Sequence, residues 1–358
     1  MLATILLAAV ITAVPPDAKR YAPPAATQSE LITNMAAAAK ALAEVLPAQE
    51  MKLATFSYGG KEHKFWNYIP TPLLTNPDAV GSTYAPQGRF GVPVEKMSPQ
   101  AVDRLHALLR ASLSIDGYQR YLQIMRVEGP GQPEFSITGL NRSPTSKPGG
   151  GPGWCHFSLF GAIGEGGEGG EGGWGWRFEG HHFSLSMEVS GGQVRFSPVM
   201  VGYNPWPQVP TANLRAVSLF ESLSKEQQVL AQLITVSPDQ GIPADIERVP
   251  GRPQPVGVVL GKLSAVGQYA YNRLVDEFIG QFPDAAVNEL RARVQQESET
   301  ATLAWYGTLD HAKPYFVRLQ GKSFLIQMRH NGIEATGFIH GHLSYHALDV
   351  GTGSNPLP

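Results

Sequence analysis

The spacing of apolar residues predicts helices in the first third of the chain. Apolar residues recur at three- and four-residue steps, which places them on one helix face; they are Leu31, Met35, Ala38, Leu42, Val45 and Leu46. A second helix is expected from Ser98 and Pro99, because serine caps helices and proline suits the first helical position. It continues through Val102, Leu105, Leu108 and Leu109. Residues 70–93 are expected to form an irregular connection.

Alternation in the middle of the chain predicts a β-hairpin over residues 174–200. One face would carry His181, Phe183, Leu185, Met187 and Val189, and the other His182, Ser184, Ser186 and Glu188. Gly191 and Gly192 supply the turn, and Val194, Phe196 and Pro198 belong to the return strand. Residues 154–160 read as a buried strand, and the Gly-Gly-Glu repeats after Glu165 as a surface loop.

The last part of the chain predicts helices followed by strands. Helical segments are expected at residues 214–236, in two pieces divided near Ser224, and at 265–282 and 285–299. Strands are expected at 302–306, 315–319, 323–328 and 336–345, forming an antiparallel meander. Strands and helices occur in blocks and do not alternate. The sequence therefore predicts an α+β protein with a mixed, mainly antiparallel sheet and helices packed on it.

Composition indicates a folded, exported protein. The 358 residues are 42% apolar and 16% charged, which suits a single α+β domain over residues 29–351 with a flexible tail at 352–358. Residues 2–14 form an apolar run of signal-peptide length, too short for a membrane span. Residues 1–28 are thus expected to be a signal peptide, or else a disordered leader, since no Lys or Arg precedes the run. A signal peptide implies a periplasmic or extracellular location.

Charge and cysteine content exclude several classes of protein. The formal net charge is −2, and no run of Lys or Arg forms a phosphate-binding stripe, so nucleic acid is not expected as a partner. The single cysteine, Cys155, excludes an intramolecular disulfide and a thiolate zinc site. Zincin, α/β-hydrolase, P-loop and Rossmann motifs are absent. The expected partner is a small-molecule substrate or ligand.

Two histidine-bearing segments carry most of the candidate chemistry. His340 and His342 lie two residues apart, so in a strand they share a face and can converge on one ion. His181 and His182 would point to opposite faces of a regular strand, so at most one of them joins a given site. These four residues are the expected ligands of a divalent metal, zinc first, with iron and copper left open. A metal-free polar cleft, and histidines that only satisfy buried hydrogen bonds, remain alternatives.

Acidic and nucleophilic candidates accompany the histidines. Glu179 and Asp349 are the expected orienting or base residues. The Ser-x-x-Lys pattern at Ser222 matches a hydrolase nucleophile motif, but Ser224 and Gln227 equally form a helix capping box, and capping is favoured. Three arginines could each bind a carboxylate through two hydrogen bonds; they are Arg177, Arg215 and Arg318.

Two motifs point to a family. The segment Trp-Gly-Trp-Arg-Phe-Glu-Gly-His-His at residues 174–182, followed by Pro-Val-Met-Val-Gly-Tyr-Asn-Pro at 198–205, resembles the bacterial domain of unknown function 3500 family. The resemblance extends over residues 31–351. This chain departs from the family pattern at Gln327, where an acidic residue is expected, and at Tyr345 and His346, where Arg-Asp is usual. The resemblance implies the extent of the fold and the importance of the histidines, and no reaction.

The leading functional hypothesis is metal-assisted hydrolysis of an ester, amide or similar group. The alternative is a non-enzymatic secreted protein whose aromatic and histidine side chains line a ligand cleft. A structural envelope protein is a third possibility, and it predicts neither bound metal nor a concave pocket.

Overall fold

The computed structural model describes residues 25–68, 74–75, 88–128, 152–166, 172–206, 210–234, 254–333 and 339–348. Several predicted features lie wholly or mostly outside these residues: the leader, the connection at 70–93, the Gly-Gly-Glu repeats, Asp349 and the tail. The domain boundaries at 29 and 351 stay predictions. Within the described part, no helix has the length and apolarity that a bilayer crossing requires.

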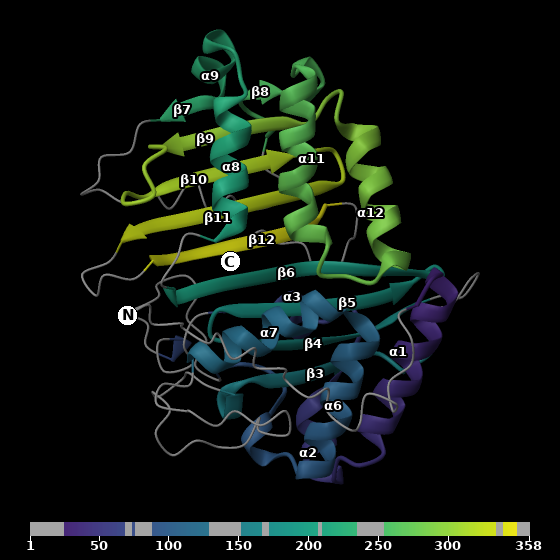
Figure 1. Ribbon diagram of the computed structural model, residues 1–358. Coiled ribbons are helices and arrows are strands. Elements are labelled where there is room, and N and C mark those ends of the chain that lie inside the picture. Colours follow the sequence, from purple (N-terminus) through teal and green to yellow (C-terminus); the bar gives the residue numbers. More distant parts are fainter. Residues whose placement is uncertain are drawn as a thin grey trace, which may run out of the picture.

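The strands of the described residues form one twelve-stranded sheet (Figure 1). Its order is β1-β3-β4-β5-β6-β12-β11-β10-β9-β7, with β2 beside β3 and β8 beside β9. All pairs are antiparallel except β1–β3 and β7–β9. The strands are β1 Thr55–Phe56, β2 Val92–Pro93, β3 His156–Phe160, β4 Trp174–Gly180, β5 Phe183–Ser190, β6 Gln193–Trp206, β7 Gln232–Ile234, β8 Val258–Val259, β9 Thr302–Gly307, β10 Tyr315–Gln320, β11 Phe324–Ile333 and β12 Ile339–Ala347.

Long helices cover one face of this sheet (Figure 1). α1, α6 and α7 lie over the lower half of the sheet in that view, and α8, α11 and α12 over the upper half. The helices are α1 Gln28–Ala43, α2 Ala48–Ala54, α3 Lys61–Lys64, α6 Pro99–Ser112, α7 Ile115–Glu128, α8 Thr211–Glu221, α9 Lys225–Ala231, α11 Ala265–Ile279 and α12 Asp284–Glu297, with 3-10 turns η3 Val94–Lys96, η4 Pro152–Trp154 and η5 Leu260–Lys262. The predicted α+β class is confirmed.

The core lies between the sheet and these helices. Every second strand residue faces it, as the alternation predicts; from β5 these residues are Phe183, Leu185, Met187 and Val189. They pack with the buried stripe of α1, formed by Leu31, Met35, Ala39 and Leu42. Each buried aliphatic or aromatic side chain of this kind contributes about 1.5–3 kcal/mol by leaving water.

Helix starts follow the capping residues in the sequence. Ser98 caps α6, and its Oγ accepts a hydrogen bond from the backbone N–H of Ala101 at 3.2 Å. Ser224 and Gln227 form a complete capping box at α9, which accounts for this segment without nucleophile chemistry. Two predictions were incomplete. No helix is predicted from the sequence at the position of α7. The helix expected to continue to residue 236 ends at Ala231, and β7 follows it at the edge of the sheet.

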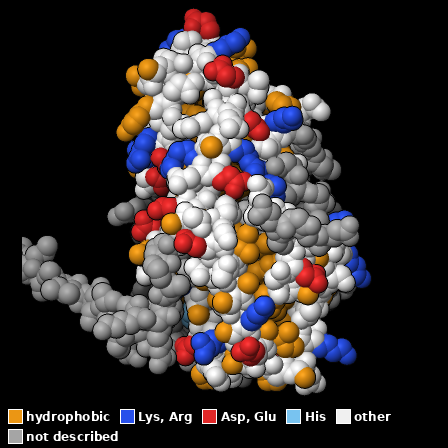
Figure 2. Space-filling view, turned by 90° about the vertical axis from the view of Figure 1, so that its right-hand side faces the viewer, with side chains coloured by type: hydrophobic (Ala, Val, Ile, Leu, Met, Phe, Trp, Pro, Cys, Tyr) orange, Lys and Arg blue, Asp and Glu red, His pale blue; other side chains and the backbone are white. Residues whose placement is uncertain are grey.

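The side of the molecule that carries α1 and α12 is shown in Figure 2. Acidic and basic side chains are interspersed on it, and hydrophobic side chains gather in its lower half. Within α12, Arg293 pairs with Glu289 one helical turn away at 3.1 Å. Because the two signs alternate, this side presents no field of a single sign.

The elements of the first half of the sheet recur in the second. Two helices lead to a short strand, β1 or β7, which pairs parallel to the first strand of a meander. A two-residue strand, a 3-10 turn and two helices follow: β2, η3, α6 and α7 in one half, and β8, η5, α11 and α12 in the other. Four antiparallel strands complete each half, and the halves meet at the β6–β12 pair. The sheet order therefore reads the same from both edges.

The repeat is also visible in the sequence. Arg-Phe-Glu-Gly at residues 177–180 matches Arg-Leu-Gln-Gly at 318–321, and both segments lead into a hairpin turn. The carbonyls of His182 and Ser323 occupy equivalent places in these turns. Each accepts a backbone hydrogen bond from its neighbouring chain segment, at 2.6 and 2.7 Å respectively. The chain thus consists of two structurally similar halves whose hairpin turns differ in chemistry.

The repeat yields a stability prediction at two equivalent glycines. Gly91 and Gly257 have φ of +106° and +100°, and a Cβ there would collide with the carbonyl oxygen of Phe157 or Leu303 respectively. We expect Gly257→Ala to lower the free energy of unfolding by about 2–4 kcal/mol, through strain and overlap together. Gly172→Ala is the control, because it has φ of +84° with open space around it. It should cost about 1–2 kcal/mol in urea unfolding, from backbone strain alone; equal losses would contradict the role of the close carbonyl.

Candidate metal centre

The second face of the sheet, opposite the long helices, is polar and largely buried. Strand alternation places on it Arg177, Glu179, Ser184, Ser186, Glu188, Gln327, Arg329, His340, His342, Ser344 and His346. Residues 61–68 contribute to its cover. The Arg177 guanidinium donates to the carbonyls of Glu62 and His63, at 2.9 and 3.1 Å. Buried polar groups need such partners, so this face is a natural location for a chemical site.

Three histidines meet on this face. His340 and His342 come from β12, on the shared face that the spacing predicts. His182 comes from the turn between β4 and β5 and is buried. The Nε2 atoms of His182 and His340 lie 3.1 Å apart, and those of His340 and His342 lie 3.2 Å apart. We refer to His182, His340 and His342 as the histidine triad.

The geometry of the triad suits a small metal ion. One ligand nitrogen from each residue falls within 4.8 Å of the other two. A tetrahedral site with Zn–N bonds of about 2.0–2.1 Å separates its nitrogens by about 3.3–3.4 Å. The two observed spacings are close to this value. Among the residues that the structure describes, this group consists of imidazoles alone.

The prediction that His181 and His182 lie in a strand, and so point to opposite faces of it, was wrong. The two residues form the turn between β4 and β5, and do not lie inside a strand. His182 adopts φ of +62°, which few non-glycine residues do and which locally strains the backbone. The His181 ring stacks on that of His182 at 3.9 Å between centroids. His181 is not part of the triad, although it touches one member.

Backbone contacts hold the turn in place. The His182 N–H donates to the Tyr68 carbonyl at 3.1 Å, and the His182 carbonyl accepts from the Gly202 N–H. Gly202 has a steric role as well, because a Cβ there would lie 2.7 Å from Cδ2 of His182 and 2.9 Å from Cδ2 of His342. The absence of a side chain on β6 therefore makes room for two imidazoles. In the second half of the chain, Ser323 stands at the position equivalent to His182, and the structure describes no second group of this kind among the residues it covers.

Polar and aromatic neighbours surround the triad. His340 Nδ1 lies 3.2 Å from the side-chain amide of Asn331, whose Oδ1 accepts from Arg329 Nε at 2.8 Å. A half-turn of the amide would present Oδ1 to a protonated Nδ1 of His340, the tautomer whose Nε2 lone pair is available to a metal, and would give up the contact with Arg329. His342 is partly exposed, but its Nδ1 is buried and makes no hydrogen bond with the described residues. The Tyr68 ring packs against His342, with centroids 4.7 Å apart.

The surroundings of His342 keep this residue in the form that binds metal. Desolvation, reinforced by the nearby His182, His340 and Arg329, lowers the pKa of His342 well below its ordinary value. A metal ligand must be a neutral imidazole, because protonation occupies the lone pair. The environment of His342 thus favours metal over proton.

The fourth histidine on this face has a different setting. His346 lies on the same side of β12, where Nε2 is 3.1 Å from the Ser344 hydroxyl and the ring is 5.7 Å from Trp66. It lies outside the triad, and its contacts are those of a buried structural histidine.

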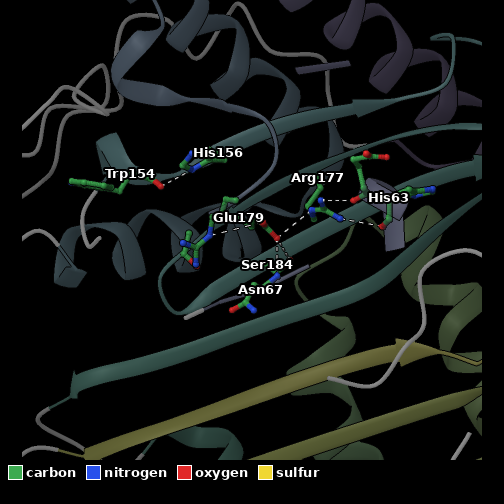
Figure 3. A network of polar contacts seen from close by, with 10 residues as sticks. His63, Asn67, Trp154, His156, Arg177, Glu179 and Ser184 are labelled. Atoms are coloured by element: carbon green, nitrogen blue, oxygen red, sulfur yellow. Dashed lines mark hydrogen bonds and ion pairs between the residues drawn. The ribbon is translucent and has the colours of Figure 1, made fainter. Parts of the chain in front are cut away.

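Glu179 lies on the polar face but is held by other groups (Figure 3). Its carboxylate pairs with Arg177 Nε at 3.2 Å and lies 3.9 Å from Arg89 Nε. It also accepts from the Asn67 N–H at 3.1 Å and from the Ser184 hydroxyl at 3.4 Å. The predicted pairing of Glu179 with His181 is not among these contacts. Instead, the carboxylate fixes the backbone at Asn67, and the next residue, Tyr68, contacts the triad.

The three arginines considered as carboxylate clamps have separate environments. Arg177 is committed to Glu179 and to two backbone carbonyls. Arg215 pairs with Glu277 on the helical side at 3.5 Å. Arg318 lies over the Phe316 ring at 5.7 Å. They do not form one clamp.

Sequence reasoning missed several residues near the triad, namely Tyr68, Gly202, Arg329 and Asn331. Alternation along β11 places Arg329 and Asn331 on one face, but only the pairing of β11 with β12 brings that face to the histidines. For Tyr68 and Gly202 the sequence holds no signal, since their roles arise from contacts between distant segments.

Comparison with known proteins identifies a family. The family model described as "Protein of unknown function (DUF3500)" matches residues 28–348. The chain belongs to this family. The match spans nearly the whole chain, so the resemblance drawn from the tryptophan and histidine motifs is confirmed. No curated protein and no solved structure matches this DUF3500 chain. Membership supports the extent of the fold and assigns no reaction.

Proposed function

We propose that this protein binds one divalent metal ion at the histidine triad and uses it for hydrolysis. The observation that carries the proposal is the convergence of three imidazole Nε2 atoms, two of the spacings being 3.1 and 3.2 Å. Imidazoles this close either share protons or bind one ion. Backbone contacts at His182 and the small Gly202, which hold the rings together, support the second state.

Zinc is the first candidate for this ion. Three neutral imidazoles in a tetrahedral arrangement leave a fourth position for water or substrate, which is the ligand pattern of catalytic zinc. Imidazole also suits iron and copper, so the metal must be identified by analysis.

Hydrolysis of an ester or amide is the reaction that such a site would support. When bound, the ion would lower the pKa of a water and polarise the substrate carbonyl. Hydrolysis would add the elements of water across the ester or amide bond, with the oxygen on the carbonyl carbon and a proton on the leaving atom. The contacts of Glu179 favour a positioning role for it. Asp349 remains the candidate base, and residues 2–14 support export.

The test is metal analysis of protein purified without an affinity tag, combined with turnover of a nitrophenyl ester. We expect about one equivalent of zinc per chain, and hydrolysis that chelator abolishes and zinc restores. The His340→Ala, His342→Ala double variant should lose both, and His311→Ala should keep both. His311 is the matched control because it is partly exposed, bonds the Tyr315 hydroxyl and is not among the residues that could hold the ion.

The outcomes separate the hypotheses. Metal that survives the double substitution would refute the triad as its site. Stoichiometric metal without turnover of any ester or amide would contradict the enzyme hypothesis and favour a secreted binding protein. Cell fractionation tests export, and retention of the chain in the cytoplasm would contradict it.

A further inference from the structure

The side-chain amide of Asn331 connects the histidine triad to the neighbouring strand β11. Its Oδ1 accepts from Arg329 Nε at 2.8 Å, and its Nδ2 lies 3.2 Å from Nδ1 of His340. The Nε of an arginine can only donate, so the amide atom that faces it must be the oxygen. The atom that faces His340 is then the nitrogen, and the contact with Arg329 sets the orientation of the amide.

This orientation determines where His340 carries its proton. The amide N–H donates to Nδ1, so a neutral His340 carries its proton on Nε2. That N–H can donate to the Nε2 atoms of His182 and His342, which lie 3.1 and 3.2 Å away. The three imidazoles are then joined by hydrogen bonds, which is the arrangement of protons expected for the metal-free protein.

Metal binding at the triad requires the other tautomer of His340. Coordination uses the lone pair of Nε2, so the neutral ring must carry its proton on Nδ1. The exchange leaves the ring neutral, because Nε2 gives one proton to water and Nδ1 takes one from water. The new Nδ1–H would face an N–H of Asn331, so two donors would meet without an acceptor. A half-turn of the amide removes this conflict and breaks the contact with Arg329 Nε.

We infer that Asn331 is a positioning residue whose amide turns with metal occupancy, bonding Arg329 in the metal-free protein and His340 Nδ1–H in the loaded protein. Metal-ligating histidines usually donate their second ring N–H to an oxygen that fixes the ring, and Oδ1 of Asn331 would supply that oxygen. The inference rests on the metal binding in the proposed function and does not depend on hydrolysis. It makes metal occupancy on β12 detectable at Arg329 on β11.

A second asparagine provides an internal control for this turn. On α8, Nδ2 of Asn213 lies 3.2 Å from Nδ1 of His330, which is the same contact at the same distance. The Oδ1 of Asn213 accepts from the Tyr203 hydroxyl at 2.9 Å. His330 is not in the group that could hold the ion, and its Nε2 lies 2.7 Å from the His311 carbonyl, which fixes its proton there. Metal binding therefore gives the Asn213 amide no reason to turn.

The experiment is NMR of the full-length ¹⁵N-labelled protein before and after one equivalent of Zn²⁺. We expect the proton of His340 to lie on Nε2 before zinc and on Nδ1 after it, and the signals of the Asn331 amide and Arg329 Nε–H to shift together. The ring tautomer of His330 and the amide signals of Asn213 should stay unchanged. Asn331→Leu, which has similar volume and no polar atom, should abolish the zinc-dependent shift of Arg329 Nε–H.

Asn331→Asp is the rescuing variant, because a carboxylate offers oxygen to both partners without turning. In this variant we expect the proton of His340 to lie on Nδ1 even without zinc. Zinc affinity, measured by competition with a chromophoric chelator, should rise about tenfold or more above that of the wild type, the usual scale for groups that orient metal ligands.

The outcomes distinguish failure of this inference from failure of the proposed function. Equal zinc-dependent shifts of Arg329 Nε–H in wild type and Asn331→Leu would overturn the inference, since they would come from the charge of the metal alone. So would a His340 proton on Nδ1 in the metal-free wild type, or zinc affinity in Asn331→Asp no higher than in wild type; metal binding would stand in all three cases. A wild-type protein that takes up no zinc would refute the proposed function and this inference with it.

Discussion

Lowering the pH from 7 to 5 is expected to reduce the free energy of unfolding by several kcal/mol. Four histidines away from the triad have environments that disfavour the charged form. Burial lowers the pKa of His106, His156, His330 and His346 to about 4. The folded state favours the neutral form of these side chains, so protonation in acid destabilises it.

The direction of the effect follows from proton binding. In the unfolded chain these histidines have pKa values near 6.5, so between pH 6.5 and 4 the unfolded state binds more protons than the folded state. Stability is therefore full above pH 6.5 and is lost as the pH falls toward 4. Each histidine contributes about 3 kcal/mol in total, of which about 2 kcal/mol is already lost at pH 5.

Urea unfolding at pH 7 and pH 5 measures this loss, and His346→Gln tests its origin. His346 is fully buried, and its Nε2 bonds the Ser344 hydroxyl. In the variant, the difference in stability between the two pH values should shrink by about 2 kcal/mol, whatever the substitution costs at pH 7. A wild-type stability that is unchanged between pH 7 and pH 5 would contradict the neutral-histidine account.

Glu179→Gln should be the most damaging single substitution on the polar face. Arg177 and Arg89 are both fully buried at the side chain, and the Glu179 carboxylate is the anion that pairs with them. Glutamine preserves volume and can still accept from the Asn67 N–H, so the change removes mainly charge. An uncompensated buried cation costs about 3–5 kcal/mol, and we expect a loss of that size in urea unfolding.

Glu277→Gln provides a matched control for this prediction. Glu277 also pairs with two arginines, Arg120 and Arg215, at 3.9 and 3.5 Å, but its side chain is 19% exposed and theirs are more so. Pairs near the surface contribute at most about 1 kcal/mol. Similar losses in the two variants would show that burial of the Arg177–Glu179 pair does not set its energetic role.

The Glu179 variant has a second expected consequence. Because the carboxylate binds the Asn67 N–H, and the next residue, Tyr68, bonds His182, the segment over the triad depends on it. Zinc affinity should fall by about tenfold or more in Glu179→Gln, the usual effect of disturbing the groups that orient metal ligands. Zinc affinity should be unchanged in Glu277→Gln.

Local patterns predicted most secondary structure because their causes are local. The stripe from Leu31 to Leu42 and the caps at Ser98 and Ser224 act within a few residues, and the corresponding helices begin where expected. The alternation from Phe183 to Val189 likewise identified the core face of β5. The prediction at His181 and His182 was wrong because continuous alternation concealed a turn, which has no Gly-Gly signal of the kind found at residues 191–192.

The sequence by itself determined the class of the fold, the shared face of His340 and His342, and the family. The tertiary structure decided which other histidine joins them, that Glu179 serves a buried ion pair, and that Arg329 stands beside the triad. The physical reason is distance along the chain. His182 and His340 are 158 residues apart, and only the pairing of β6 with β12 brings them within 3.1 Å. Local periodicity fixes the side to which each residue points, whereas strand order fixes its neighbours.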